Sequence, residues 1–72
     1  MDIQDIAKNM KEKIGQASSN EVVESPSLSL DQAKELNDSY LSSYVIFGID
    51  PADPKNPSNG KYVVCVKGGQ NA

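Results

Sequence analysis

Residues 43 to 67 read SYVIFGIDPADPKNPSNGKYVVCVK, with two apolar runs on either side of a proline-rich segment. The two runs, residues 43 to 49 and 61 to 67, are rich in β-branched and aromatic residues, which favour strands. Residues 50 to 60 hold three of the four prolines of the chain and end in an Asn-Gly pair that favours a turn. The stretch therefore predicts a β-hairpin with an exposed, stiffened loop.

The N-terminal end of the chain is predicted to be helical, and the C-terminal end is predicted to fray. Apolar residues recur at spacings of three and four between Ile3 and Ile14, which predicts an amphipathic helix over residues 2 to 14. Gly15 is expected to end this helix, because glycine readily adopts the left-handed conformation found there. Residues 68 to 72 begin with two glycines and are otherwise polar, so we expect this tail to fray.

A strand and a second helix are predicted between the first helix and the hairpin. Residues 21 to 24 begin the strand, and Pro26 follows closely. Because proline cannot donate to a sheet ladder, this strand should lie at an edge or leave the sheet near that point. Ser29 and Gln32 have the spacing of a capping box, so the second helix should begin near Leu30.

The order helix, strand, helix, strand, strand predicts a single α+β domain over residues 1 to 72, with two helices on one face of a small antiparallel sheet. At this length an apolar core supplies only a small margin of stability. The chain has one cysteine and no histidine. An intramolecular disulfide is therefore excluded, and an ordinary zinc site is not expected.

Covalent catalysis is not expected of this chain. Without histidine, neither a Ser-His nor a Cys-His arrangement can form. Cys65 lies within an apolar run and is expected to be a core residue. The acidic residues of the proline-rich loop lack the ligand spacing of a calcium loop. We therefore predict no catalytic residue, metal or cofactor, and we expect binding to be the function.

The distribution of charge indicates the kind of partner. The net charge is -3, and residues 14 to 54 carry seven acidic residues but one lysine. The chain has no arginine, so direct binding of nucleic acid is disfavoured and a basic protein surface is the more natural partner. No apolar run is long enough to span a membrane, and the N-terminus does not resemble a signal peptide. We expect a cytoplasmic protein without membrane contact.

Glu24 and Ser25 lie at the exit of the predicted edge strand, near acidic residues of the second helix. Carboxylates placed along a strand and an adjoining helix can present oxygens as a phosphate backbone does. A protein that normally binds DNA could bind such a surface in its place. Glu24 and Ser25 are therefore the first candidate binding residues.

The successive segments DIAKNMKEKIG, EVVES, SLSLDQAKEL, YVIFGI and KYVVCV resemble, in order and pattern, the small phage-encoded uracil-DNA glycosylase inhibitors, which are DNA mimics. The resemblance covers nearly the whole chain. It implies a monomer that binds uracil-DNA glycosylase one to one in the host cytoplasm and blocks its DNA-binding groove. The residues that it places against the enzyme are Glu24, Ser25, Gln32 and Glu35, with Gln32 standing where the family has a further acid.

The same resemblance implies an apolar pocket between the second helix and the sheet. In the family, this pocket takes up the side chain that the glycosylase inserts into DNA during base flipping. Carried over by position, the pocket is lined by Leu28, Ala33, Leu36, Phe47, Val63 and Cys65. These residues are also what the core of a small domain requires, and solvent access between the second helix and the hairpin distinguishes the two interpretations.

Two other classes of function stay open from the sequence. The chain could be an acidic accessory protein, such as a phage anti-host factor or an immunity protein, that binds a different protein target with the same acidic face. It could also be a structural subunit that self-associates through its edge strand. Competition by DNA separates the first class from a DNA mimic, and concentration-dependent oligomerisation identifies the second.

Overall fold

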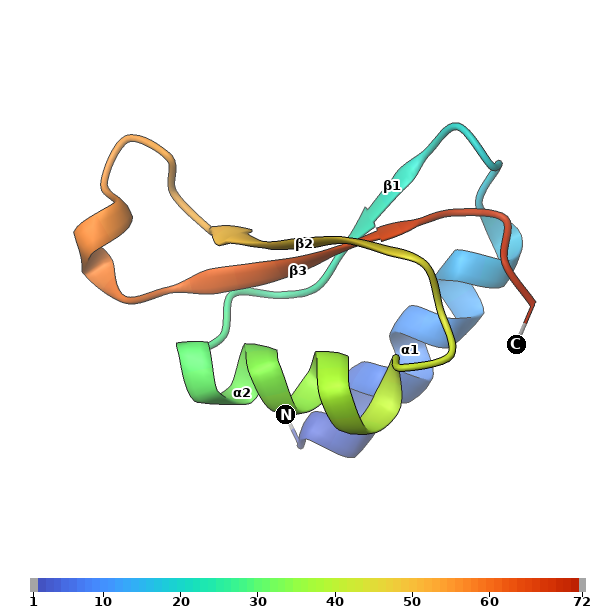
Figure 1. Cartoon of the computed structure of the whole chain (residues 1–72), viewed down its shortest axis with the longest axis horizontal. Helices are drawn as coiled ribbons and strands as arrows, with labels where there is room; N and C mark the ends of the chain where they lie inside the picture. Colours follow the sequence, from blue (N-terminus) through green and yellow to red (C-terminus); the bar gives the residue numbers. More distant parts are fainter. Residues whose placement is uncertain (1, 72) are drawn as a thin grey trace.

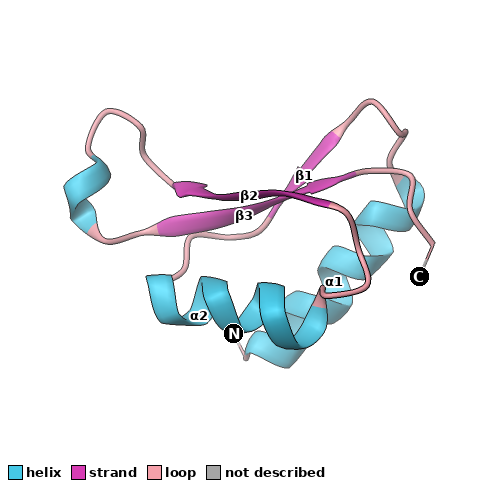
Figure 2. Cartoon of the chain, viewed as in Figure 1, coloured by secondary structure: helices cyan, strands magenta, loops and turns pink. Residues whose placement is uncertain are grey.

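Three antiparallel strands form one sheet, and both helices lie against the same face of it (Figures 1 and 2). A computed structural model describes residues 2–71. In chain order the elements are α1 (Ile3–Gln16), β1 (Val22–Glu24), α2 (Leu30–Glu35), β2 (Ile46–Pro51) and β3 (Tyr62–Lys67). The predicted α+β fold with a small antiparallel sheet and two helices is confirmed.

Helix α1 is longer at its C-terminal end than predicted. It begins after Asp2, whose side chain accepts a hydrogen bond from the Gln4 N–H at 3.4 Å. Gly15 does not end it, because the Ala17 N–H still donates to the Lys13 carbonyl at 2.9 Å and extends the helical bonding past the glycine. The apolar positions of the helix are buried, as their spacing predicts.

Helix α2 begins at the predicted capping box. The Ser29 hydroxyl accepts from the Gln32 N–H at 3.3 Å, and the Gln32 side chain accepts from the Ser29 N–H at 3.4 Å. The helix continues as a π-helical turn (Leu36–Tyr40), in which the Leu41 N–H donates to the Leu36 carbonyl at 3.0 Å. This wider turn lets Leu36 and Leu41 both lie fully buried in the core.

The sheet has the strand order β1-β3-β2, so β3 is central and antiparallel to both neighbours. The predicted hairpin between β2 and β3 and the predicted edge position of β1 are confirmed. Strand β2 begins later than expected and runs to Pro51, and the Ala52 N–H still bonds to the Lys61 carbonyl at 2.9 Å. The loop then contains a 3₁₀ turn (Pro57–Asn59) and closes at Gly60, which has a φ of 77° as the predicted turn requires.

The core lies between the sheet and the helices. Strand β3 supplies Val64 and Val66, which are fully buried, while β1 supplies Val23. Alternation along the strands turns their other side chains to the opposite face, which no helix covers (Figure 1). The buried cluster consists of Ile6, Ala7, Met10, Ile14, Val23, Leu28, Ala33, Leu36, Leu41, Val64 and Val66.

The C-terminal tail is bonded to the domain instead of frayed. The Gly68 N–H donates to the Glu21 carbonyl at 2.9 Å, and the Gly69 N–H donates to the Ile14 carbonyl at 2.7 Å. The side-chain amide of Gln70 bonds to both the N–H and the carbonyl of Val45. The prediction of a frayed tail is therefore wrong for residues 68–70, and residue 72 lies outside the described residues.

The close approach of the tail makes a test of this packing. A Cβ at Gly68 would collide with the Ser18 carbonyl oxygen and lie 2.9 Å from the Ala17 Cβ. We expect Gly68→Ala to lower the free energy of unfolding by about 2 kcal/mol, measured by urea denaturation. The control is Gly15→Ala, whose Cβ would only press on the Asn71 side chain and which adds helix propensity. Equal effects of the two substitutions would contradict this account of the tail.

Candidate functional site

The edge strand β1 ends at Glu24, just before Ser25 and Pro26, because proline cannot donate to the ladder. The Ser25 N–H donates to the Val64 carbonyl at 3.0 Å, and the Val64 N–H donates to the Ser25 hydroxyl oxygen at 2.8 Å instead of to a backbone carbonyl. Pairing with β3 resumes at Leu28, which exchanges two hydrogen bonds with Tyr62 at 2.8 and 2.7 Å. The β1 side of this pairing contains one extra residue, as in a β-bulge.

The structure separates the two residues of the Glu24-Ser25 pair. The Ser25 side chain is 5% exposed and is occupied by β3, so the predicted role of its hydroxyl as a phosphate substitute is wrong. Glu24 is exposed and lies opposite Cys65 on the face of the sheet that the helices leave open. Of this pair, Glu24 is thus the residue that a partner can reach.

The role of Ser25 is open to a stability measurement. Ser25→Ala leaves the buried Val64 N–H without an acceptor, so we expect the free energy of unfolding to fall by about 1–3 kcal/mol. Ser27→Ala, two residues along the chain and exposed, is the matched control and should change little. Urea denaturation of the two variants measures the difference, and equal stabilities would show that the hydroxyl is not a structural acceptor.

The six residues predicted to line one apolar pocket lie on opposite faces of the sheet. Leu28, Ala33 and Leu36 belong to the core on the helix side. Val63 and Cys65 alternate with the core residues of β3 and therefore point to the other face. Phe47 is 62% exposed. These side chains cannot line one cavity, so the predicted pocket between the second helix and the sheet is wrong.

A β-bulge in β2 accounts for the wrong placement of Phe47. Between Ile46 and Gly48 the pairing with β3 shifts by one residue, which makes Phe47 an extra residue. Strict alternation puts Phe47 and Ile49 on a common face. Because the bulge interrupts the alternation, Ile49 packs against the core while Phe47 is exposed. A one-residue shift of this kind leaves no clear trace in the sequence except the glycine beside it.

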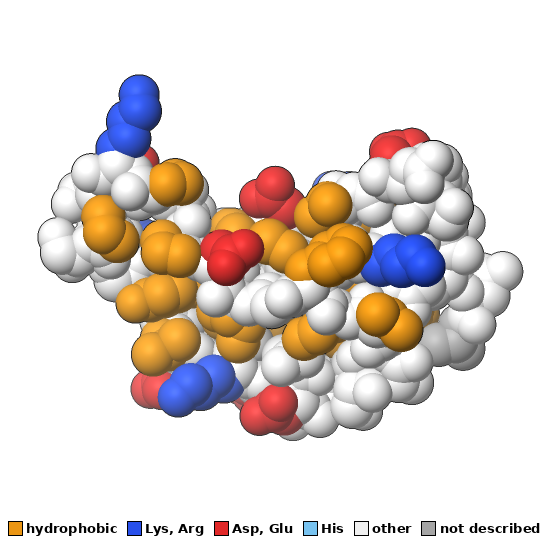
Figure 3. Space-filling view, turned by 45° about the horizontal axis from the view of Figure 1, so that its top comes forward, with side chains coloured by type: hydrophobic (Ala, Val, Ile, Leu, Met, Phe, Trp, Pro, Cys, Tyr) orange, Lys and Arg blue, Asp and Glu red, His pale blue; other side chains and the backbone are white. Residues whose placement is uncertain are grey.

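The uncovered face of the sheet is where exposed apolar residues gather. Val22 is 53% exposed, and Val45 and Phe47 are each 62% exposed. In Figure 3, hydrophobic side chains form a band across the molecule, with acidic side chains among them and lysines toward both ends. Strand pairing places Glu24 and Asp50 on the same side of the sheet as this band. An apolar surface bordered by charge is typical of protein interaction sites.

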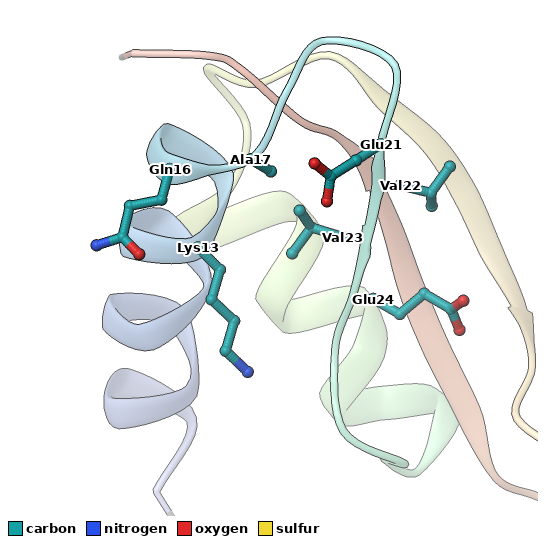
Figure 4. A pocket seen from close by; sticks show the side chains of 7 residues that line it. All are labelled: Lys13, Gln16, Ala17, Glu21, Val22, Val23 and Glu24. Carbon is teal, nitrogen blue, oxygen red and sulfur yellow. The ribbon is translucent and has the colours of Figure 1, made fainter.

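A groove of about 460 Å³ lies between the C-terminal half of α1 and the outer edge of β1 (Figure 4). Figure 4 shows Lys13 extending from α1 into the gap, while Val22 and Glu24 point away from α1. The groove was not predicted, because it depends on how α1 packs against β1, which no local pattern specifies. Its lining residues are Lys13, Gln16, Ala17, Glu21, Val22, Val23 and Glu24.

The two candidate residues of α2 have different surroundings. Gln32 is exposed, but its side-chain oxygen accepts from the Ser29 N–H and so forms part of the helix cap. Glu35 is exposed near the C-terminal end of α2. Of the four residues predicted to contact a partner, Glu24 and Glu35 therefore present carboxylates to solvent. Gln32 and Ser25 are engaged in structural hydrogen bonds.

Cys65 is buried, as predicted, and its thiol donates to the Asp50 carboxylate at a Sγ–Oδ2 distance of 3.5 Å. Burial, the hydrogen bond to Asp50 and the nearby negative charges of Asp50 and Glu24 raise the pKa of the thiol from 9.0 to about 11. A thiol with so high a pKa is a poor nucleophile at neutral pH. Within residues 2–71, no group of three or more acidic, cysteine or histidine residues could hold a metal ion.

The raised pKa predicts slow modification of Cys65. At about pH 8, the thiolate fraction should be about 100-fold lower than that of a thiol with the ordinary value, and burial slows reaction further. Alkylation by iodoacetamide should therefore be at least that much slower in the native protein than in urea. Asp50→Asn removes one cause of the shift and should speed the native reaction several-fold. A native rate equal to the rate in urea would contradict the prediction.

Comparisons of the chain with protein-family models, with curated proteins and with solved structures give no match. The resemblance to the uracil-DNA glycosylase inhibitors therefore stays a prediction. Across residues 2–71, no helix has the length and the apolar character needed to cross a membrane. The fold and the surface around β1 are thus the observations on which a function can be argued.

Proposed function

We propose that this chain is a protein-binding domain without catalytic activity, and that its partner has a basic surface that normally contacts DNA. The observation that carries the proposal is the position of Glu24, which is exposed at the end of an unshielded edge strand and beside exposed apolar residues. On the strength of the sequence resemblance, uracil-DNA glycosylase is the target to test first.

The charge and the shape of the surface support this class of partner. Glu24 of β1 and Asp50 of β2 both lie on the uncovered face of the sheet. A positively charged surface is attracted to these two carboxylates, and complementary charge speeds association and excludes wrong partners. Val22 and Phe47 add apolar area, which supplies affinity when the partner excludes water.

The proposed mechanism is competitive occupation of a DNA-binding surface by the β1 edge and the uncovered face of the sheet. It needs no pocket, since the partner meets apolar side chains that already lie at the surface. An accessory or immunity protein against another target would use the same face, and the exposed apolar band fits that class of function as well. Competition with DNA distinguishes them, because only a ligand of the DNA-binding groove is displaced by DNA.

A uracil-excision assay tests the glycosylase target. Purified uracil-DNA glycosylase and a uracil-containing oligonucleotide are titrated with the wild-type protein, and we expect inhibition near one equivalent. Glu24→Gln should raise the concentration needed for half inhibition about tenfold, since it removes a charge while keeping the shape. Glu12→Gln is the matched control, because Glu12 is exposed on α1 and does not line the groove.

Each outcome of the assay tests a different part of the proposal. Full enzyme activity at a large molar excess of wild-type protein would exclude uracil-DNA glycosylase as the target. Equal inhibition by wild type and Glu24→Gln would exclude the role assigned to Glu24. Inhibition that excess undamaged DNA does not relieve would show binding outside the DNA groove and would favour the accessory class.

A further inference from the structure

The outer edge of β1 carries backbone groups without partners. In an antiparallel pair, successive residues turn their N–H and C=O groups alternately toward and away from the neighbouring strand. The Glu21 carbonyl bonds to Gly68, just beyond β3, and the Ser25 N–H bonds to Val64 of β3. Residues 21, 23 and 25 therefore face β3, and Val22 and Glu24 turn their backbone groups outward. Neither residue makes a hydrogen bond to a loop or side chain within residues 2–71. An outward row of this kind is a template for another strand.

The other edge of the sheet is protected. Alternation from the Ala52 N–H, which bonds to Lys61, turns Pro51 outward, and proline has no N–H to offer. The bulge at Phe47 interrupts the same edge farther along β2. Proline and bulges are the devices by which proteins block edge-to-edge pairing. On β1 the corresponding interruption lies beyond residue 24, so Val22–Glu24 stays available.

The groove beside β1 gives the incoming strand a charge pattern. Val22 and Glu24 point to the uncovered face, whereas Val23 points toward α1, where Lys13 extends into the gap (Figure 4). A side chain opposite Glu24 should therefore be basic, and a side chain opposite Val22 should be apolar. The residue between them faces the α1 side, where Lys13 favours an acidic side chain.

We propose that the outer edge of β1 binds an extended segment of a partner protein as a fourth, antiparallel strand, with the order basic, acidic, apolar opposite Glu24, Val23 and Val22. The proposal deepens the proposed function in that it names how a protein partner is held, but it does not require that partner to be a glycosylase. A second copy of this chain fits poorly, because β1 carries Glu24 and no basic residue. In an antiparallel pair centred on Val23, Glu24 would stand opposite Val22 of the second copy and would gain no basic partner.

A peptide titration followed by amide NMR spectra tests strand addition directly. The probe is the acetylated, amidated pentapeptide Thr-Arg-Asp-Val-Thr, added to the isotope-labelled protein at millimolar concentrations. We expect saturable shifts at the amides of Val22 and Glu24, which gain hydrogen bonds. The amides of Val23 and Ser25 already bond to β3 and should move much less. Absence of saturable shifts at Val22 and Glu24 would overturn the proposal.

Three matched peptides separate backbone pairing from charge. N-methylation of the peptide valine removes an N–H that faces β1 and should abolish binding, whereas N-methylation of the peptide aspartate, which faces away, should be tolerated. Exchange of the arginine and aspartate keeps composition and net charge but should weaken binding about tenfold. Glu24→Lys should reverse that preference. Equal effects of the two N-methyl groups would exclude strand addition.

The remaining outcomes identify other occupants. Without any peptide, the Val22 and Glu24 amide signals could shift as the protein concentration rises. Such shifts would show that a second copy occupies the edge, and they would overturn the proposal that a different protein supplies the strand. If the wild-type chain inhibits uracil-DNA glycosylase but does not bind the peptides, strand addition is excluded and the proposed function stands. The peptides could shift the Val22 and Glu24 amides but not those of Val23 and Ser25, while the chain fails to inhibit the glycosylase. This result would support strand addition and exclude only that enzyme as the target.

Discussion

The rest of the structure depends on β3 being hydrogen-bonded along both of its edges. The chain has no disulfide, so the sheet holds together only through this strand, with β1 on one side and β2 on the other. Its valines at 64 and 66 also supply the sheet side of the core, against which both helices pack. At this size such a core gives a small margin of stability. Loss of one buried bond along β3 would therefore be felt by every element.

Features set by neighbouring residues were predicted from the sequence. The capping box at Ser29 fixes where α2 begins, and Pro26 indicates an edge strand, because each acts through its own backbone. Two predictions based on glycine were wrong. Gly15 stays helical, and the glycines after β3 lie in close contact with the loop that follows α1. In both places, bonding to other parts of the fold overrides the tendency of glycine to end or loosen a segment.

The candidate site was predicted less well than the fold, because the face on which a strand residue lies depends on the exact residue count along the strand. A strand presents its side chains with a period of two, so one bulged residue moves everything beyond it to the other face. Phe47 is such a residue, so it is exposed while Ile49 packs against the core. Alternation along β3 puts Val63 and Cys65 on one face but does not tell which face the helices cover. Similarly, Ser25 looks like a surface hydroxyl in sequence. In the fold, its hydroxyl accepts from the Val64 N–H where the ladder would otherwise supply a backbone carbonyl.

The central position of β3 has a consequence for biosynthesis. Strands β1 and β2 pair with β3 and not with each other, although both precede it in the chain. While a ribosome is still adding the proline-rich loop, neither strand has its partner, and the valines of β1 cannot be sheltered by a completed sheet. The sheet thus forms only after β3 has been made, and β1 pairs with it over a long sequence separation. The nascent chain must keep its unpaired strands from other chains until then.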